Sequence, residues 1–321
     1  MQLPAAFERH VFSGLEPALG FDVVYGGHFE HRLLSTRRAT MEHQRLVLGD
    51  VRVETGCYDF PVIALGAMPR DAVCIGLVAE GAERTRCNTE AIEDNEVHIY
   101  GPGVELMYHA AGHSHWINFT VPEAKLQAHA SERAGRSLKL PRRGIVRARL
   151  DRGGRARLQL LVHDAVALAG ELQPDGIGQA LAEAISHALV SAYVDALCAA
   201  EMTDQAPRTA SAWRHHHVIL ACERLVRGGE MMKMDLTEIA RRSGYTLRTL
   251  ELIFRGSVGM TPGRYFLNMR LNGALRDLLR GGPGGSVTEV ASRWGFRHLS
   301  RFAAQYHQAF GELPSQTLTR R

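Results

Sequence analysis

The sequence contains the same ten-residue pattern twice, and this repeat limits the possible folds more than any other feature. "LTEIARRSGY" begins at Leu236, and "VTEVASRWGF" begins at Val287, 51 positions later. Both copies keep a Thr-Glu pair, an alanine and a glycine. The C-terminal part of the chain is therefore expected to build one small structural unit twice.

Each copy carries the signals of a helix start. Asp235 stands three residues before Glu238, and Ser286 stands three residues before Glu289, which is the spacing of a capping box. In such a box the first side chain accepts hydrogen bonds from free N–H groups of the first helical turn. Both copies are therefore predicted to begin with a well-defined helix.

A glycine follows a small alanine in both copies, Gly244 after Ala240 and Gly295 after Ala291. Alanine lets a second helix cross closely, and glycine tolerates the positive φ of a tight turn. This pattern is typical of a helix-turn-helix, whose second helices would lie in "TLRTLELIFRGSVG" and "RHLSRFAAQYHQAFG". Two such units in series are hard to obtain by chance.

Basic residues gather in the same part of the chain. The whole sequence has a formal net charge of only +4, but residues 236–321 contain 13 arginines against 5 acidic residues. The rest of the chain is therefore net acidic. An arginine excess confined to the repeated units favours a nucleic-acid partner.

The first part of the chain shows a period of two instead. Alternating runs separated by Gly, Pro and Asp turns predict antiparallel strands of a sandwich or barrel over residues 1–150. The clearest runs are Val51 and Val53, Val97 and Ile99, and Ile117, Phe119 and Val121.

After residue 150 the period lengthens to that of a helix. Residues 151–200 contain two apolar stripes, and the helices that carry them either cover the β-domain or form a homodimer seam. The second stripe includes Ile177, Leu181, Ile185 and Leu189. Residues 201–211 are predicted to be a polar linker, and residues 212–321 are predicted to be helical.

Roughly the last hundred residues resemble the AraC/XylS family of bacterial transcription regulators. The resemblance rests on "LTEIARRSGY", "FRGSVGMTPGRYFLNMRLNGALRDLL" and "VTEVASRWGFRHLSRFAAQYHQAFGELPS". It implies an α+β protein with a cupin-like antiparallel β sensor domain over 1–150 and an all-α domain with two helix-turn-helix motifs over 212–321. The last of these stretches is closest to the branch that senses small catabolic metabolites, which implies an activator.

The resemblance also implies partners. These are a promoter site on double-stranded DNA, RNA polymerase, and a small-molecule effector in the N-terminal domain, whose binding residues the sequence does not identify. The helix between the two units, "PGRYFLNMRLNGALRDLL", would be about 27 Å long. One turn of B-DNA is about 34 Å, so the units could enter successive major grooves on one DNA face. Because the two copies differ, the DNA site need not be palindromic.

The second helix of the first unit is predicted to contact DNA. Leu250 and Phe254, four residues apart, belong to the core. The opposite face, which is expected to bind DNA, carries Thr246, Arg248, Thr249 and Glu251, with Arg255 at the far end.

These side chains suit different parts of DNA. Arg248 could pair with O6 and N7 of guanine or contact phosphate alone, and Glu251 could accept from a cytosine amino group. Arg255 is expected to contact phosphate. Family members often have arginine where this chain has Leu252, so contact with bases by this helix departs from the family pattern.

In the second unit the buried stripe is predicted to be Phe302, Tyr306 and Phe310. The outward side chains, expected to bind DNA, are Arg297, His298, Ser300 and Arg301. Arg301 is the strongest candidate for a base contact. Trp294 and Phe296 flank the turn and are expected in the core, and Arg270 matches a family arginine expected to be tied to a carboxylate or helix end.

Two groups of histidines raise the question of a metal. His113 and His115 would share one strand face, as in metal-binding cupins, but no glutamate follows at the required spacing. His215, His216 and His217 are consecutive and point in different directions on a helix, so they are expected to form a solvated face. The sequence predicts no metal site.

Catalytic motifs are also missing from the sequence. There is no Gly-x-Ser-x-Gly, no phosphate-binding loop and no pair of carboxylates at a plausible site, so neither an enzyme nor a cofactor is predicted. No apolar run approaches the roughly 20 residues of a membrane span, and no signal peptide is evident, so a cytoplasmic protein without membrane contact is expected. Two alternatives stay open: a metal-dependent cupin enzyme with a DNA-binding tail, and a regulator gated by a partner protein.

Overall fold

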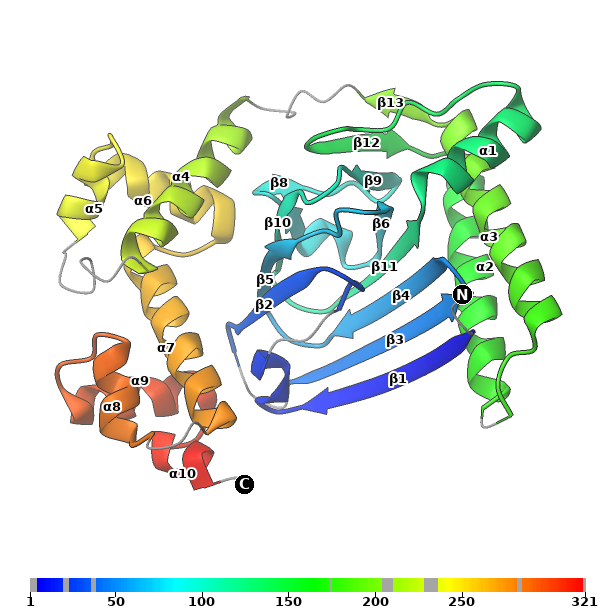
Figure 1. Cartoon of the computed structure of the whole chain (residues 1–321). Coiled ribbons are helices and arrows are strands. Elements are labelled where there is room, and N and C mark those ends of the chain that lie inside the picture. Colours follow the sequence, from blue (N-terminus) through cyan, green and yellow to red (C-terminus); the bar gives the residue numbers. More distant parts are fainter. Residues whose placement is uncertain are drawn as a thin grey trace.

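Figure 1 shows the computed structural model of the chain, in which a β-domain with helices on one side adjoins an all-helical domain. The structure describes residues 5–19, 23–35, 39–173, 175–203, 210–227, 236–281 and 285–319. The predicted α+β class is confirmed, with antiparallel sheets in the N-terminal part and helices in the C-terminal part.

The β-domain consists of two sheets. The larger sheet has the order β1-β3-β4-β11-β6-β9-β12-β13, and the smaller has the order β2-β5-β10-β7-β8. The larger sheet contains β1 (Ala6–Ser13), β3 (Thr40–Leu48), β4 (Val51–Tyr58), β6 (Val73–Glu80), β9 (Glu96–Tyr100), β11 (Ser114–Val121), β12 (Ile145–Arg149) and β13 (Glu201–Thr203). The smaller sheet contains β2 (His28–Leu33), β5 (Val62–Ala67), β7 (Thr85–Cys87), β8 (Glu90–Ala91) and β10 (Glu105–Ala110).

Three helices cover the outer face of the larger sheet: α1 (Glu123–Ala134), α2 (Arg152–Glu171) and α3 (Gln179–Ala199). The predicted period-two runs supply the sheet side of this core, and Phe119 stacks on Tyr193 of α3 with ring centroids 4.1 Å apart. On the opposite face of β11, Trp116 points into the space between the two sheets. The alternation expected from the sequence is thus confirmed.

Three residues of the predicted dimer stripe, Leu181, Ile185 and Leu189, lie on α3, whereas Ile177 precedes the first residue of this helix. Leu189 is fully buried against the larger sheet, whereas 37% of Leu181 remains exposed. By length and composition alone α3 would be able to cross a membrane, but its buried side chains belong to the core of the β-domain. The stripe therefore serves first to cover the sheet.

The first residues of the segment predicted as a linker form a strand. Residues 201–203 form β13, which pairs with β12 at the edge of the larger sheet. The next helix, α4 (Ala210–Arg227), begins two residues earlier than the predicted domain start. Backbone pairing with an available sheet edge overrides the polar composition of this segment.

The all-helical domain continues from α4 with α5 (Leu236–Arg242), α6 (Leu247–Val258), α7 (Pro262–Arg280), α8 (Val287–Arg293), α9 (Leu299–Phe310) and α10 (Pro314–Thr319). The helix α7 joins two similar pairs, α5 with α6 and α8 with α9 (Figure 1). The predicted buried stripes are confirmed, since Leu250 and Phe254 on α6 and Phe302 and Tyr306 on α9 are inaccessible to solvent.

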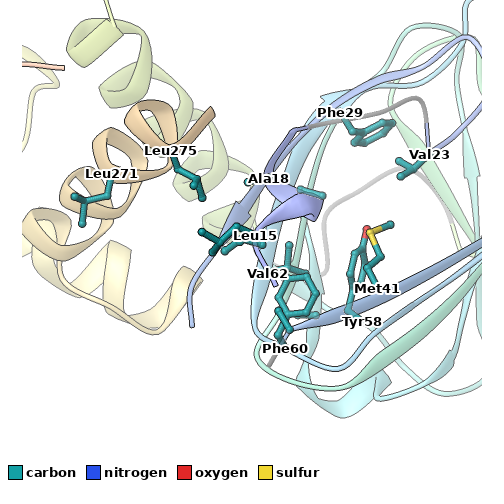
Figure 2. Packing of buried hydrophobic residues seen from close by; sticks show 14 of the residues in the cluster. Leu15, Ala18, Val23, Phe29, Met41, Tyr58, Phe60, Val62, Leu271 and Leu275 are labelled. Atoms are coloured by element: carbon teal, nitrogen blue, oxygen red, sulfur yellow. The ribbon is translucent and has the colours of Figure 1, made fainter. Parts of the chain in front are cut away.

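The two parts of the chain share a hydrophobic core. Leu271 and Leu275 on α7 belong to the same buried cluster as Leu15 and Ala18 of the short helix η1 (Glu16–Leu19) and its flanking turn. Figure 2 shows Leu275 beside these two residues, with the interior of the β-domain beyond them. The helix that connects the two repeated units is therefore also the helix that packs on the β-domain.

Candidate nucleic-acid interface

The two turns have the same backbone geometry. Gly244 has a φ of +79° and Gly295 a φ of +74°, a region that side chains with a Cβ disfavour. In each copy the residue after the glycine donates its N–H to the carbonyl of the conserved alanine, at 3.0 Å in the first and 2.9 Å in the second. The two copies of the sequence repeat thus form the same backbone hydrogen bond at the turn.

The helix starts differ in detail. Ser286 and Glu289 form a complete capping box at α8, as predicted. Asp235, the predicted cap of α5, lies outside the described residues. The hydroxyl of Thr246 caps α6 by accepting from the backbone N–H of Thr249 at 3.1 Å. Thr246 was predicted to contact DNA, and in this structure its side chain forms the N-cap of α6.

The polar side chains predicted to bind DNA lie on the faces opposite the buried stripes. Thr246, Arg248 and Arg255 of the first unit are exposed, and Thr249 and Glu251 are partly exposed. All four predicted residues of the second unit, Arg297, His298, Ser300 and Arg301, are exposed. Within the described part of the chain none of the arginines in these two sets forms an ion pair, so their charge is available to an anionic partner.

Other arginines of the same domain are engaged. Glu238 accepts hydrogen bonds from both Arg241 and Arg242 and offsets one of their two positive charges. Arg293 pairs with Asp277 at 3.0 Å. Among the described residues, exposed arginines without an ion pair thus lie on α6, on α7 and at the start of α9.

An exposed leucine also lies on the second helix of the first unit. Leu252 is 64% exposed on α6, although it is one of the larger apolar side chains of the domain. An apolar side chain in the major groove contacts the methyl group of thymine. In the sequence, Leu252 is marked only by its departure from the family pattern.

Arg270 fixes the second turn from α7. Its guanidinium donates to the carbonyl oxygens of Trp294 at 2.8 Å and Gly295 at 2.9 Å, and it lies 4.2 Å from the ring centre of Phe296. Burial lowers the pKa of this guanidinium. The expectation that Arg270 is tied to a helix end is confirmed. Because α7 has 19 residues, it separates the two units by about 28 Å.

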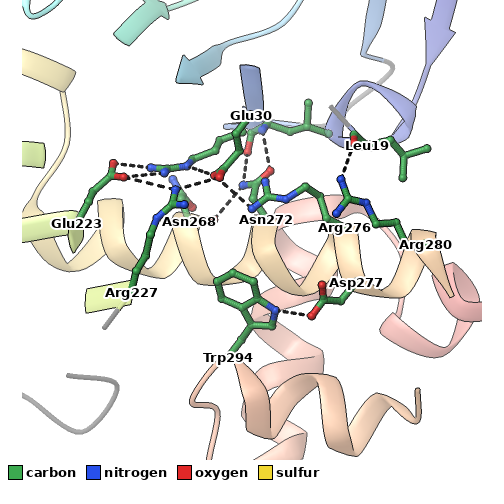
Figure 3. A network of polar contacts seen from close by, with 12 residues as sticks. Leu19, Glu30, Glu223, Arg227, Asn268, Asn272, Arg276, Asp277, Arg280 and Trp294 are labelled. Atoms are coloured by element: carbon green, nitrogen blue, oxygen red, sulfur yellow. Dashed lines mark hydrogen bonds and ion pairs between the residues drawn. The ribbon is translucent and has the colours of Figure 1, made fainter. Parts of the chain in front are cut away.

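A buried ion pair joins the β-domain to α4. Arg32 on β2 donates to both carboxylate oxygens of Glu223, at 2.7 and 2.8 Å, and Tyr265 of α7 also donates to Glu223. Arg32 is 1% exposed. Glu30, two residues earlier on β2, accepts from Arg32 and Arg227 and lies 3.2 Å from Arg276 (Figure 3).

This network holds both carboxylates in the ionised form. Burial alone would raise the pKa of Glu30, but the charges of Arg32, Arg276 and Arg227 lower it to about 2. For Glu223 burial also acts against ionisation, and Arg32 shifts the pKa below its ordinary value. Both glutamates are therefore ionised at neutral pH, and their ion pairs with arginines join the two domains.

Asn272 on α7 adds a second link to β2. Its side-chain oxygen accepts from the N–H of Leu33 at 2.8 Å, and its side-chain amide donates to the carbonyl of Leu33 at 3.0 Å. Asn272 is fully buried. These contacts are not predictable from the sequence, because the partners are 239 residues apart and no local pattern marks them.

The opposite face of β2 lines an apolar pocket between the two sheets, which we call the inner pocket. Its walls include Phe29, Tyr58, Met68, Tyr100, Tyr108 and Trp116, with the buried polar groups of Glu96, His98 and Asn118. His31 on β2 lies 2.9 Å from the hydroxyl of Tyr58. Successive residues of β2 therefore contact the pocket wall and the helices α4 and α7 in turn.

The histidines noted in the sequence are placed as follows. His113 lies in the turn before β11 rather than in the strand, and its imidazole is 3.0 Å from Glu80. His216 is only 5% exposed, so the prediction that the three consecutive histidines are solvated is wrong for this residue. The reason is that α4 packs on the β-domain, and one of three consecutive helical side chains then faces inward. Within the described ranges, no three His, Cys, Asp or Glu side chains are placed to hold a metal ion.

Comparisons with known proteins agree with the geometry of the repeated units. Residues 239–320 match a family model described as a helix-turn-helix domain. The "Probable thc operon regulatory protein" of Rhodococcus erythropolis is 43% identical over 86 residues, which is 26% of each chain. The "XylDLEGF operon transcriptional activator" of Pseudomonas putida is 39% identical over 87 residues, which is 26% of this chain and 27% of that protein.

These two matches cover about a quarter of each relative. Among solved structures, the AraC-like transcriptional activator CuxR aligns over 90% of this chain and 100% of its own, at 15% identity and a TM-score of 0.39. A TM-score this low supports no argument about function. The family match covers 82 residues of this chain, 239–320.

Proposed function

Because residues 239–320 are a helix-turn-helix domain of the AraC/XylS type, we propose that the whole chain is a sequence-specific transcription regulator controlled by a small molecule. The observation that supports this most is the repeated unit. Two turns with the same hydrogen bond each lead into a helix that buries its apolar side and exposes unpaired arginines. This arrangement is suited to two contacts with one DNA duplex.

In this proposal α6 and α9 enter successive major grooves, spaced by α7. Arg301 and Arg248 contact base edges, whereas Arg255 contacts phosphate. The polar residues Thr249, Glu251, Arg297, His298 and Ser300 complete the DNA-binding set. Leu252 contributes an apolar contact where the family often has arginine.

The effector is proposed to bind in the inner pocket. Its aromatic walls suit a small, largely apolar molecule, and the buried polar groups of Glu96, His98 and Asn118 would bind one polar end. Since Phe29 of β2 lines the pocket and Arg32 of the same strand holds α4, occupancy would bias the contact between the domains. By analogy with the Pseudomonas relative, which is named a transcriptional activator, we propose that this chain activates transcription. We further propose that it does so by contacting RNA polymerase.

A homodimer is proposed through the outer side of α2 and α3. Leu160, Leu168 and Leu181 are 61%, 37% and 37% exposed there, so the apolar surface left over after covering the sheet is available to a second copy. Replacing Leu160 and Leu181 by glutamate should convert a dimer to a monomer in sedimentation experiments. An unchanged sedimentation coefficient would place the dimer contact elsewhere.

The function is tested by selecting duplexes from a random-sequence library with the full chain at physiological salt. We expect enrichment of one asymmetric site that spans about two helical turns. The control is Gly295→Val, which forces a β-branched side chain into a positive φ and should abolish enrichment. If the unchanged protein enriches no sequence, the proposed function is wrong.

A further inference from the structure

We propose that the chain has a second small-molecule site, beyond the proposed effector pocket, in a cleft between the β-domain and α4. This interdomain cleft encloses about 620 Å³, within the range of roughly 300–1,000 Å³ common for ligand pockets. Its polar and aromatic lining includes Glu90, His98 and Arg147 from the β-domain and Trp213, His216 and His217 from α4.

Among the described residues that line this cleft, three polar atoms have no hydrogen-bond partner: one is Nε2 of His98, which also lines the inner pocket, and two belong to the cleft alone. These two are Nδ1 of His216, a residue that is 5% exposed, and Oε1 of Glu90, whose other oxygen accepts from Arg147. A buried polar atom left without a partner is costly, and most such atoms in folded proteins are satisfied. A ligand that hydrogen-bonds both atoms would gain affinity at each.

The charges in the cleft cancel. Arg147 is paired with Glu90, and burial lowers the pKa of both His98 and His216 to about 4, so these imidazoles are neutral at pH 7. Glu105 and Arg143, exposed side chains of opposite sign, also line the cleft, so its lining has no net charge and a charged ligand would meet both signs. The cleft favours an uncharged ligand.

The aromatic side chains indicate the shape of the ligand. Trp213 is 57% exposed at the rim, and its ring meets His217 edge-on with centroids 4.1 Å apart. Aromatic faces at a rim bind flat rings. Since the Glu90 carboxylate can only accept, the ligand must donate. The ligand class is therefore an uncharged ring compound with hydroxyl or N–H donors.

The cleft is linked to the packing of the domains. Thr89 has a φ of +71°, unusual for a β-branched residue, and its hydroxyl donates to the carbonyl of Ala212 in α4 at 2.9 Å. One wall of the cleft is thereby fastened to the other. A ligand that contacts both walls binds only the packed arrangement and stabilises it by mass action.

The test is titration calorimetry of the full chain with four ring compounds of similar size. Resorcinol is uncharged and donates two hydrogen bonds, anisole is uncharged and donates none, benzoate is an anion, and benzylammonium is a cation. We expect saturable binding of resorcinol, with at least fivefold weaker binding of the other three. Trp213→Ala and His216→Ala should each raise the dissociation constant of resorcinol roughly tenfold, the effect of one lost contact.

The matched control is Trp116→Phe, which changes the inner pocket and not the interdomain cleft. It should leave resorcinol binding unchanged, and circular dichroism verifies the fold of each variant. Because Trp213 is exposed, its variant remains informative even if His216→Ala fails to fold. Loss of binding in Trp116→Phe with retention in Trp213→Ala would assign the ligand to the inner pocket and overturn the proposal.

Two further results would also overturn it: tighter binding of benzoate or benzylammonium, or no saturable binding by resorcinol. Neither result would bear on the DNA selection, which tests the proposed function independently.

Discussion

The guanidinium of Arg32 on β2 holds the carboxylate of Glu223 on α4 through two hydrogen bonds across 191 residues of chain. Both side chains are at least 94% buried, and Tyr265 donates to the same carboxylate. Buried pairs of this kind are costly to break from one side, because the remaining charge has lost its water and gained no partner. The pair therefore controls how firmly the two parts of the chain are joined.

Arg32→Met is expected to destabilise the protein by about 3–5 kcal/mol in urea unfolding, because Glu223 is left buried and unpaired. Arg32→Met combined with Glu223→Met should recover much of this loss. The control is Arg133→Ala, which removes an exposed bidentate pair with Asp195 and should change stability little. Equal effects of Arg32→Met and Arg133→Ala would contradict a structural role for the buried pair.

Acid should loosen the same contact. The folded pKa of Glu30 is about 2 and that of Glu223 is also lowered, so both lie below the unfolded value of about 4.3. The stabilisation is then complete above the unfolded pKa and declines as the pH falls through the folded pKa. Unfolding free energies measured from pH 5 to pH 2 should fall, and Glu30→Gln should fall less steeply. Parallel curves for the two proteins would refute the assignment.

Gly273 in the middle of α7 leaves room for the indole of Trp294. A Cβ at this position would lie 2.2 Å from ring atoms of Trp294, whose Nε1 donates to Asp277 at 2.9 Å. Gly273→Ala should therefore cost about 1–3 kcal/mol by overpacking. Gly256→Ala on the exposed side of α6 meets no atom within 4 Å and should instead stabilise by up to about 1 kcal/mol. Thermal unfolding of both variants gives the comparison.

The DNA contacts can be separated into base and phosphate contacts. Arg301→Ala should cost about 1–3 kcal/mol on the selected site and relax discrimination at one base pair, with non-specific binding nearly unchanged. Arg255→Ala should weaken binding to all sequences alike and reduce the salt slope by about one. Binding to single-base operator variants at two salt concentrations distinguishes these outcomes. A uniform loss for Arg301→Ala would mean that this side chain contacts phosphate.

Local patterns in the sequence predicted local structure well. The cap of α8, the buried stripe of α9 and the strand faces around Phe119 all follow from periodicities of a few residues. Contacts between distant segments have no such signal. No local pattern near His216 indicates that α4 packs on the β-domain. The sequence of residues 201–203 likewise does not predict that they pair with the edge strand β12.

The same limit applies to the link between the domains. An arginine in an alternating strand is usually solvated, so the sequence around Arg32 predicts a surface residue. Its burial depends on Glu223 and Tyr265, which lie 191 and 233 positions away. The exposed side chains of α6 and α9 were predictable because the buried stripe of each helix marks the opposite face.

The side-chain amide of Asn272 occupies the place of a missing neighbour strand. Because β2 is the last strand of its sheet, its outer N–H and C=O groups form a template for pairing with another polypeptide. Asn272 pairs with both groups of Leu33, and α7 covers this edge. Separation of α7 from the β-domain would thus expose the unpaired backbone groups of this edge strand. Release of the helical domain would therefore carry a risk of aggregation through strand pairing, which the packed state avoids.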